Sequence, residues 1–179
     1  MTRYVSFFAA MNVGGNRLKM EDLRDALERE EIEDVETVVA SGNVLFSYDE
    51  RPSDGMSEML AYIVKEHFGF ETFAAVRTAA EVRSAIEDNP FRGEGEDNMV
   101  HTLFLEKPVD PDQFKIMLIA YEGRGEEKIA LGDRCLYIDY VDGVGTSKLT
   151  SAFLERKLDS RGTARNMRSL QRILDKMEE

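Results

Sequence analysis

Four short segments of this 179-residue sequence carry the residue types that could bind a ligand. In the first, Asn12, Gly14, Gly15 and Arg17 follow an apolar run. Paired glycines after a strand let the backbone approach a ligand and direct N–H groups at an anion. The structural alternative is a tight turn, which a lone Gly-Gly pair favours, and the spacing is not that of a dinucleotide fingerprint.

Two further segments combine glycine with polar side chains. Ser41, Gly42 and Asn43 separate two β-branched and aromatic runs, so we expect them at a hairpin tip, with Ser41 and Asn43 orienting a ligand. Ser147 and Lys148 end a glycine loop that begins at Gly143. The residue order excludes a Walker motif, which leaves either an oxyanion site or a flexible connection into a helix.

The fourth segment comprises Thr163, Ala164, Arg165 and Asn166. Thr163 is expected to cap a helix from Ala164 to Met177, with Arg161 and Arg168 close to its start. Cations at a helix N-terminus are unfavourable unless an anion joins them. An anion would resolve this conflict. It is either a phosphate or carboxylate bound by Arg165 and the helix N–H groups, or an Asp or Glu of the protein itself.

The sequence offers little for catalysis or metal binding. Its single cysteine, Cys135, and its two histidines, His67 and His101, form no Cys/His cluster of zinc-site spacing, and no Ser/His/Asp or Cys/His arrangement emerges. We therefore predict no metal and no cofactor, assign no catalytic residue, and leave open whether the protein is an enzyme.

Charge and hydropathy limit the partners. The net charge is −12, which disfavours nucleic acid and anionic membranes. Residues 148–179 nevertheless carry eight Lys and Arg against five Asp and Glu, a net +3, which either pairs with the protein's own carboxylates or meets a ligand. Neither a signal peptide nor a membrane-spanning stretch is apparent, so a cytoplasmic protein is expected.

The elements that must position these segments are those of an α+β protein. Residues 1–77 show the order strand, helix, strand, strand, helix, strand. This is the split βαβ order of a ferredoxin-like plait, an antiparallel sheet covered by helices. Thr78 and Glu81 have capping-box spacing ahead of a short helix that ends before Asn89-Pro90.

The second half nearly repeats the first. Residues 91–98 are polar and contain glycine, so we predict a linker between halves at 1–90 and 99–179. After the linker we expect strand, helix, strand and strand, followed by two helices, so that a helix replaces the last strand. Element order alone suggests a duplication, because no repeat is visible at the level of residues.

At these positions the sequence resembles a bacterial family, domain of unknown function 1697. The likeness covers nearly the whole chain and rests on Met11-Asn12-Val13-Gly14-Gly15, Ser41-Gly42-Asn43-Val44-Leu45-Phe46, Asn89-Pro90-Phe91, Gly143-Val144-Gly145 with Ser147-Lys148-Leu149, and Thr163-Ala164-Arg165-Asn166. Met11 and Met167 stand where the family commonly has Ile and Trp. The resemblance implies two plait-like halves and implies no activity.

Two functional hypotheses follow. In the first, a cleft between the halves binds a small phosphate-bearing anion or nucleotide through the polar and basic residues of the four segments. In the second, the basic C-terminal helices dock on an acidic partner or on a second copy. An exposed apolar face on the last helix would favour the second hypothesis.

Overall fold

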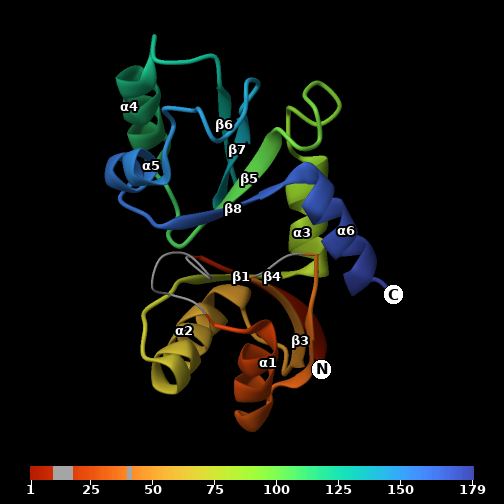
Figure 1. Cartoon of the computed structure of the whole chain (residues 1–179). Coiled ribbons are helices and arrows are strands. Elements are labelled where there is room, and N and C mark those ends of the chain that lie inside the picture. Colours follow the sequence, from red (N-terminus) through yellow and green to blue (C-terminus); the bar gives the residue numbers. More distant parts are fainter. Residues whose placement is uncertain (10–17, 40–41) are drawn as a thin grey trace. The chain divides into compact units, whose positions relative to one another are not determined.

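The computed structural model describes residues 1–9, 18–39 and 42–179. The first half forms a four-stranded antiparallel sheet in the order β2-β3-β1-β4 (Figure 1). Its elements are β1 Thr2–Phe8, α1 Met20–Arg29, β2 Glu33–Thr37, β3 Asn43–Tyr48, a 3-10 turn η1 Ser53–Gly55, α2 Met56–Phe68 and β4 Ala74–Thr78. Order and pairing confirm the predicted plait.

The first sheet is buried on both faces, which explains the continuous apolar run of β1. Tyr4 and Phe8 face the helices and pack with the stripes of α1 and α2, including Leu23 and Leu60. Val5 and Phe7 face the opposite side and are equally buried. Each such side chain contributes about 1.5–3 kcal/mol through removal from water.

The second half forms a sheet with the same topology, β6-β7-β5-β8, again antiparallel throughout. The elements that follow β4 along the chain are α3 Ala79–Glu87, β5 Val100–Leu105, α4 Pro111–Tyr121, β6 Lys128–Gly132, β7 Cys135–Asp139, α5 Ser151–Leu158, β8 Gly162–Asn166 and α6 Met167–Met177. Helices α4 and α5 cover one face (Figure 1). None of the described helices is long and apolar enough to span a membrane.

The prediction that a helix replaces the last strand of the second half is wrong. Residues 162–166 form β8, which pairs with β5 from Leu105↔Gly162 to His101↔Asn166, and α6 begins only at Met167. Thr163 is therefore a strand residue rather than a helix cap. The polar sequence of β8 suggests a helix start, but pairing with the buried strand β5 overrides that local preference.

Contacts divide the chain into two compact units, Met1–Val82 with Arg172–Glu179, and Arg83–Gln171. The divisions fall inside α3 and α6, so the end of α6 belongs with the first sheet. The Lys176 ammonium lies 3.2 Å from the Glu36 carboxylate of β2, within that first unit. The predicted boundaries at 90 and 99 stay a prediction.

Gly69 ends α2 in the left-handed conformation, with φ +77°. Replacing Gly69 by Ala should lower the free energy of unfolding by about 1–2 kcal/mol, because an L side chain is strained there. Gly55→Ala is the matched control, since φ is −71° and a Cβ meets no atom within 4 Å. Chemical denaturation should show Gly55→Ala to be neutral or stabilising, and an equal effect of both variants would refute this account.

Candidate functional site

The predicted site residues divide between the two units and the residues that the structure does not describe. Asn12, Gly14, Gly15, Arg17 and Ser41 lie outside the described residues. Gly42 and Asn43 belong to the first unit, and Ser147, Lys148, Thr163, Arg165 and Asn166 belong to the second.

Gly42 has a backbone role in the hairpin that the sequence predicts. Its φ of +91° is readily adopted only by glycine, and its carbonyl oxygen accepts a hydrogen bond from Phe8 N at 2.8 Å. Asn43 follows as the first residue of β3 and is buried.

Strand β8 directs Thr163 and Arg165 to the face of the second sheet that α4 and α5 do not cover. Ala164, between them, packs in the cluster beneath those helices. Alternation along a strand therefore places Thr163 and Arg165 on the opposite face. Arg165 Nη1 donates to Thr163 Oγ1 at 2.7 Å and to the Ala164 carbonyl oxygen at 2.9 Å.

The first sheet carries an equivalent arginine, Arg77 of β4. Arg77 is the partner of Val5 in β1, just as Arg165 is the partner of Thr102 in β5, and its Nη1 donates to the Val76 carbonyl oxygen at 2.9 Å. The next residue in each strand, Thr78 or Asn166, caps the following helix. The duplication therefore extends to side-chain contacts.

Thr102 lies directly across from Arg165 and shares its face of the sheet. Only 1% of Thr102 is exposed, and its Oγ1 has no hydrogen-bond partner. The other such buried side-chain atom in the described part of the chain is Asn89 Nδ2. An unsatisfied buried hydroxyl costs about 1–3 kcal/mol, so Thr102 Oγ1 marks a place where an acceptor would be stabilising.

Burial changes the protonation equilibrium of Arg165. Removal from water disfavours its charged form and lowers the pKa of Arg165 to about 10. The guanidinium stays charged at neutral pH, on a largely desolvated face where its attraction for an anion is weakly screened.

Asn166, and not Thr163, caps the last helix. Asn166 Oδ1 accepts from Ser169 N at 2.8 Å, which satisfies one of the first N–H groups of α6. Arg161 lies before β8 and pairs with Glu106. The expected conflict between several arginines and one helix N-terminus is therefore removed for Arg161, which lies before β8 and has its own carboxylate, whereas Arg165 is a strand residue next to the cap Asn166.

Ser147 lies on the other side of the second sheet from Arg165. Its Oγ donates to Glu127 Oε1 at 2.7 Å and accepts from Leu149 N, while Tyr121 OH donates to Glu127 Oε2 at 2.6 Å. Tyr121 and Leu149 pack in the cluster beneath α4 and α5. Ser147 thus anchors its loop, Lys148 beside it is exposed, and the sheet separates Ser147 from Thr163 and Arg165.

This Ser147–Glu127–Tyr121 network shifts the pKa of two of its members. Burial, and then the bond to Glu127, raise the pKa of Tyr121 to about 12. Burial alone would raise the pKa of Glu127, but the hydrogen bonds from Tyr121 and Ser147 outweigh it and lower that pKa. Glu127 is consequently a stable carboxylate acceptor and a weak base.

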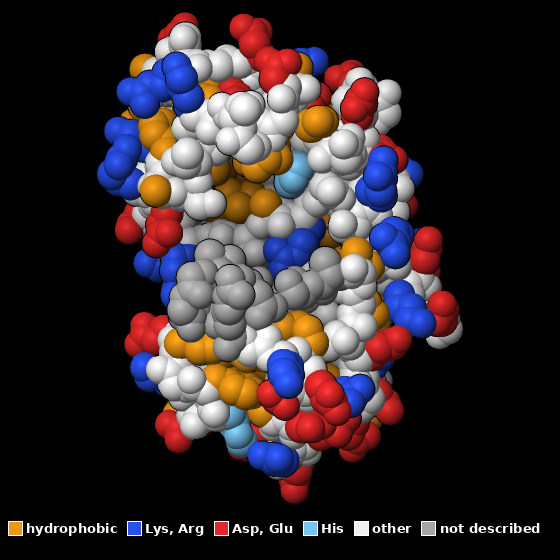
Figure 2. All heavy atoms as spheres, in the orientation of Figure 1, with side chains coloured by type: hydrophobic (Ala, Val, Ile, Leu, Met, Phe, Trp, Pro, Cys, Tyr) orange, Lys and Arg blue, Asp and Glu red, His pale blue; other side chains and the backbone are white. Residues whose placement is uncertain are grey.

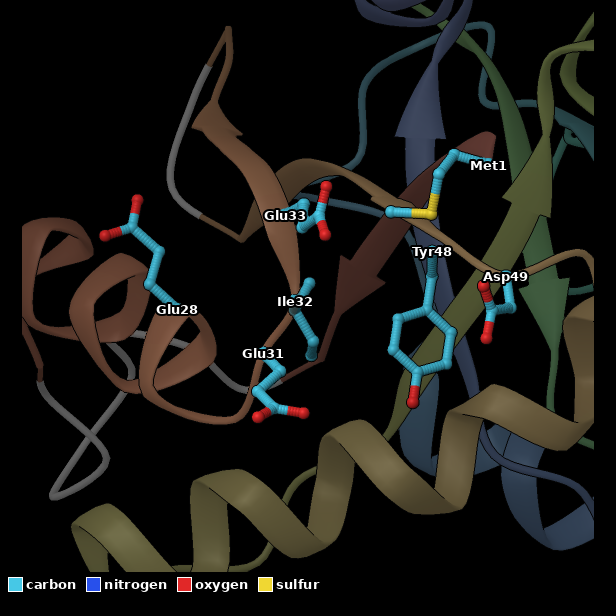
Figure 3. A pocket seen from close by; sticks show the side chains of 7 residues that line it. All are labelled: Met1, Glu28, Glu31, Ile32, Glu33, Tyr48 and Asp49. Atoms are coloured by element: carbon cyan, nitrogen blue, oxygen red, sulfur yellow. The ribbon is translucent and has the colours of Figure 1, made fainter.

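Two hollows, each lined by described residues of a single unit, are mainly acidic. One, of about 510 Å³, lies between the end of α1, the start of β2 and the end of β3, and Figure 3 shows Glu28, Glu31, Glu33 and Asp49 around Tyr48. Another, of about 450 Å³, contains Glu94, Glu96, Glu126, Asp139 and Asp142. Neither contains a predicted site residue, and the described residues form no cluster suited to a metal ion.

The surface charge is likewise mixed. On the face shown in Figure 2, the described Lys and Arg side chains are interspersed with Asp and Glu. This face therefore offers an anion no broad basic surface among its described residues.

Sequence reasoning missed Thr102, Arg77, Glu127 and Tyr121. One signal was available for Arg77, because Arg77-Thr78 and Arg165-Asn166 both combine an arginine with a helix-capping residue. Thr102 gave no signal, since its unsatisfied hydroxyl depends on what packs around it.

Comparisons with known proteins bear on family and fold. A model of the family described as protein of unknown function (DUF1697) matches residues 1–137. No curated protein matches the sequence. Among solved structures, the conserved bacterial protein SP0830 from Streptococcus pneumoniae is similar, with 19% identity and a TM-score of 0.74 over 100% of this chain and 99% of that one. At that identity, the likeness shows that the duplicated α+β fold is shared.

The Glu127 network depends on a glycine. A Cβ at Gly125 would overlap Glu127 Oε2 and lie 2.7 Å from Tyr121 OH. Gly125→Ala should displace the carboxylate and lower the free energy of unfolding by about 1–3 kcal/mol, the worth of two hydrogen bonds. Gly145→Ala, where a Cβ meets nothing within 4 Å, is the control in the same denaturation experiment. Equal stability of both variants would show that the network contributes nothing.

His101 should make stability depend on pH. Burial lowers its pKa from 6.5, although Nδ1 contacts the Met99 carbonyl oxygen at 3.0 Å, and its ring meets Tyr140 edge-on. The unfolded chain therefore binds the proton more tightly, so the free energy of unfolding should fall as pH drops below about 6.5. Urea titrations should show a smaller fall for His101→Gln, and identical pH profiles would contradict the assignment.

Proposed function

Because the chain belongs to the DUF1697 family, whose description names no ligand or reaction, we propose a function from geometry: the second unit binds a small phosphate-bearing anion on the Thr102, Thr163 and Arg165 face of its sheet. The observation that carries the proposal is the buried Thr102 hydroxyl, which has no hydrogen-bond partner and lies on the neighbouring strand, directly opposite Arg165. A phosphate oxygen would accept that hydroxyl proton and offset the charge of the desolvated guanidinium.

The contacts of Arg165 support recognition by orientation as well as by charge. Nη1 is held by Thr163 Oγ1 and by the Ala164 carbonyl oxygen, which fixes the plane of the guanidinium. A guanidinium of fixed orientation binds a planar or tetrahedral oxyanion with less loss of side-chain entropy than a free one. Lysine at this position would supply charge without that geometry.

The wider site predicted from the sequence stays a prediction. It would add the Ser147-Lys148 loop, Asn166 and the predicted residues of the first half, in a cleft between the halves. Those of the first half are Asn12, Gly14, Gly15, Arg17, Ser41, Gly42 and Asn43. Ser147 already donates to Glu127, so its part in anion binding would require that bond to change.

One observation favours the ligand hypothesis over docking through the C-terminal helix. Four apolar residues of α6, Met167, Leu170, Ile173 and Met177, are buried, and the fifth, Leu174, is half-buried. Their burial leaves α6 without the exposed apolar face that such docking would use.

Thermal unfolding in the presence of inorganic phosphate, sulfate, nucleotides and sugar phosphates tests the proposal. A ligand that binds only the native state raises stability by mass action, by about 2.7 kcal/mol at a hundredfold excess over Kd. Thr102→Val should raise the free energy of unfolding without ligand by about 1–3 kcal/mol, because the unsatisfied hydroxyl is gone, and should weaken or abolish the ligand-induced shift.

Two further variants define the outcome. Thr146→Val, at an exposed threonine of the same unit, should change neither stability nor the shift. Arg165→Lys should weaken the shift while keeping the charge. The proposal fails if no compound of the panel raises the midpoint of the wild-type protein, or if the shift persists unchanged in Thr102→Val.

A further inference from the structure

Asn89 is the second residue in the described part of the chain with a buried side-chain atom that lacks a hydrogen-bond partner. It is 3% exposed, and the unpartnered atom is its amide nitrogen Nδ2. Its Oδ1 accepts a hydrogen bond from Phe91 N at 2.9 Å, which fixes the amide with its donor end free. An unsatisfied buried donor costs about 1–3 kcal/mol, so an acceptor at Nδ2 would be stabilising.

The connection between α3 and β5, residues 88–99, places Asn89 near the second sheet. Figure 1 shows this connection on the side of that sheet away from α4. Burial, Cys135 and then the carboxylate of Asp88 raise the pKa of Tyr137, so Asp88 lies close to that phenol. Further along the connection, Gly95 lies against the sheet, because a Cβ there would overlap the side chains of Asp139 and Val100.

Thr102 lies among the sheet residues that the connection contacts. Tyr137 is the partner of Thr102 in β7, Arg165 is its partner in β8, and Val100 precedes it by two residues in β5. Cross-strand partners and alternate residues of a strand share one face of a sheet. Asn89, which follows Asp88 directly, therefore lies at the same face as Thr102 and Arg165.

The charges of this face favour a ligand with one negative charge. Arg165 supplies a buried cation, whereas Asn89, Thr102 and Thr163 are uncharged. Asp139 is a buried carboxylate of the same face, and Lys128, its partner in β6, is exposed. A doubly charged anion would exceed the charge of Arg165 and be repelled by Asp139 where water screens little.

We propose that Asn89 is a third donor of the anion site and that the site selects a singly charged phosphate, such as a phosphodiester. This inference rests on the function proposed above. Asn89 Nδ2 and the Thr102 hydroxyl donate to the phosphate oxygens, and the Arg165 guanidinium neutralises the single charge. A phosphate monoester carries about 1.5–2 negative charges at pH 7, which this set of groups leaves partly uncompensated.

Asn89→Asp tests the donor, because a carboxylate oxygen can still accept from Phe91 N while an acceptor replaces Nδ2. Thermal-shift titrations with dimethyl phosphate should give binding about tenfold to a hundredfold weaker, the worth of a hydrogen bond to a charged group. Asn89→Ser removes the donor without adding a charge and should also weaken binding. Asn98→Asp, at an exposed residue of the same connection, controls for the added charge and should bind as the wild type does.

Three small anions test the charge of the ligand. At pH 7 methyl sulfate and dimethyl phosphate carry one negative charge, whereas methyl phosphate has the shape of methyl sulfate but carries about 1.5–2. At equal concentration, the two singly charged anions should raise the thermal midpoint of the wild-type protein more than methyl phosphate does. Some anions stabilise proteins without binding a site, so the shift of Thr102→Val is subtracted in each case.

The outcomes separate this proposal from the proposed function. A shift that disappears in Thr102→Val but keeps its full size in Asn89→Asp and Asn89→Ser overturns the role of Asn89 and leaves the function standing. A larger shift with methyl phosphate than with methyl sulfate overturns the single charge. If no anion shifts the midpoint, the function and this inference both fail. The comparison of anions uses the wild-type protein, so it decides even where circular dichroism shows a variant to be unfolded.

Discussion

The pairing of β8 with β5 is the interaction on which the candidate site depends. It completes the second sheet, and it fixes the direction of each side chain from Gly162 to Asn166. Because alternate residues of a strand face opposite ways, the same pairing buries Ala164 beneath the helices and places Arg165 beside Thr102. Had these residues begun a helix, Arg165 and Thr102 would share no face.

A four-stranded open sheet leaves two outer strands whose backbone groups need partners, and for one of them, β4 or β8, the duplicated halves meet this requirement with equivalent side chains. Arg77 and Arg165 each reach back to the carbonyl of the preceding residue. An arginine in this position serves the sheet as well as any ligand, because it lowers the risk of edge-to-edge aggregation. This structural role accounts for Arg77 and for part of the geometry of Arg165. The unsatisfied Thr102 hydroxyl is found in the second half alone, because Val5 occupies the equivalent position in the first.

Local patterns in the sequence predicted most of the fold. The order of apolar runs over residues 1–77 predicted the elements of the first sheet, and the capping box at Thr78 and Glu81 located the start of α3. Strand β8 was missed because Thr163, Arg165 and Asn166 have the types expected around a helix start, and only pairing with a distant strand shows otherwise. Of the residues predicted for the candidate site, Thr163 and Arg165 lie on the same face of the second sheet, and Ser147 lies on the opposite face. The role proposed for Thr102 arises from tertiary burial, which no local pattern encodes.

The assignment of residues 172–179 to the first unit has a consequence for the order of folding during synthesis. These residues leave the ribosome after the whole of the second unit, yet they pack with the first sheet, where Lys176 pairs with Glu36. The N-terminal unit therefore lacks part of its native contacts while the second plait is being made and folded. Completion of the first unit waits on the last turns of α6, which couples two units that would otherwise fold in sequence.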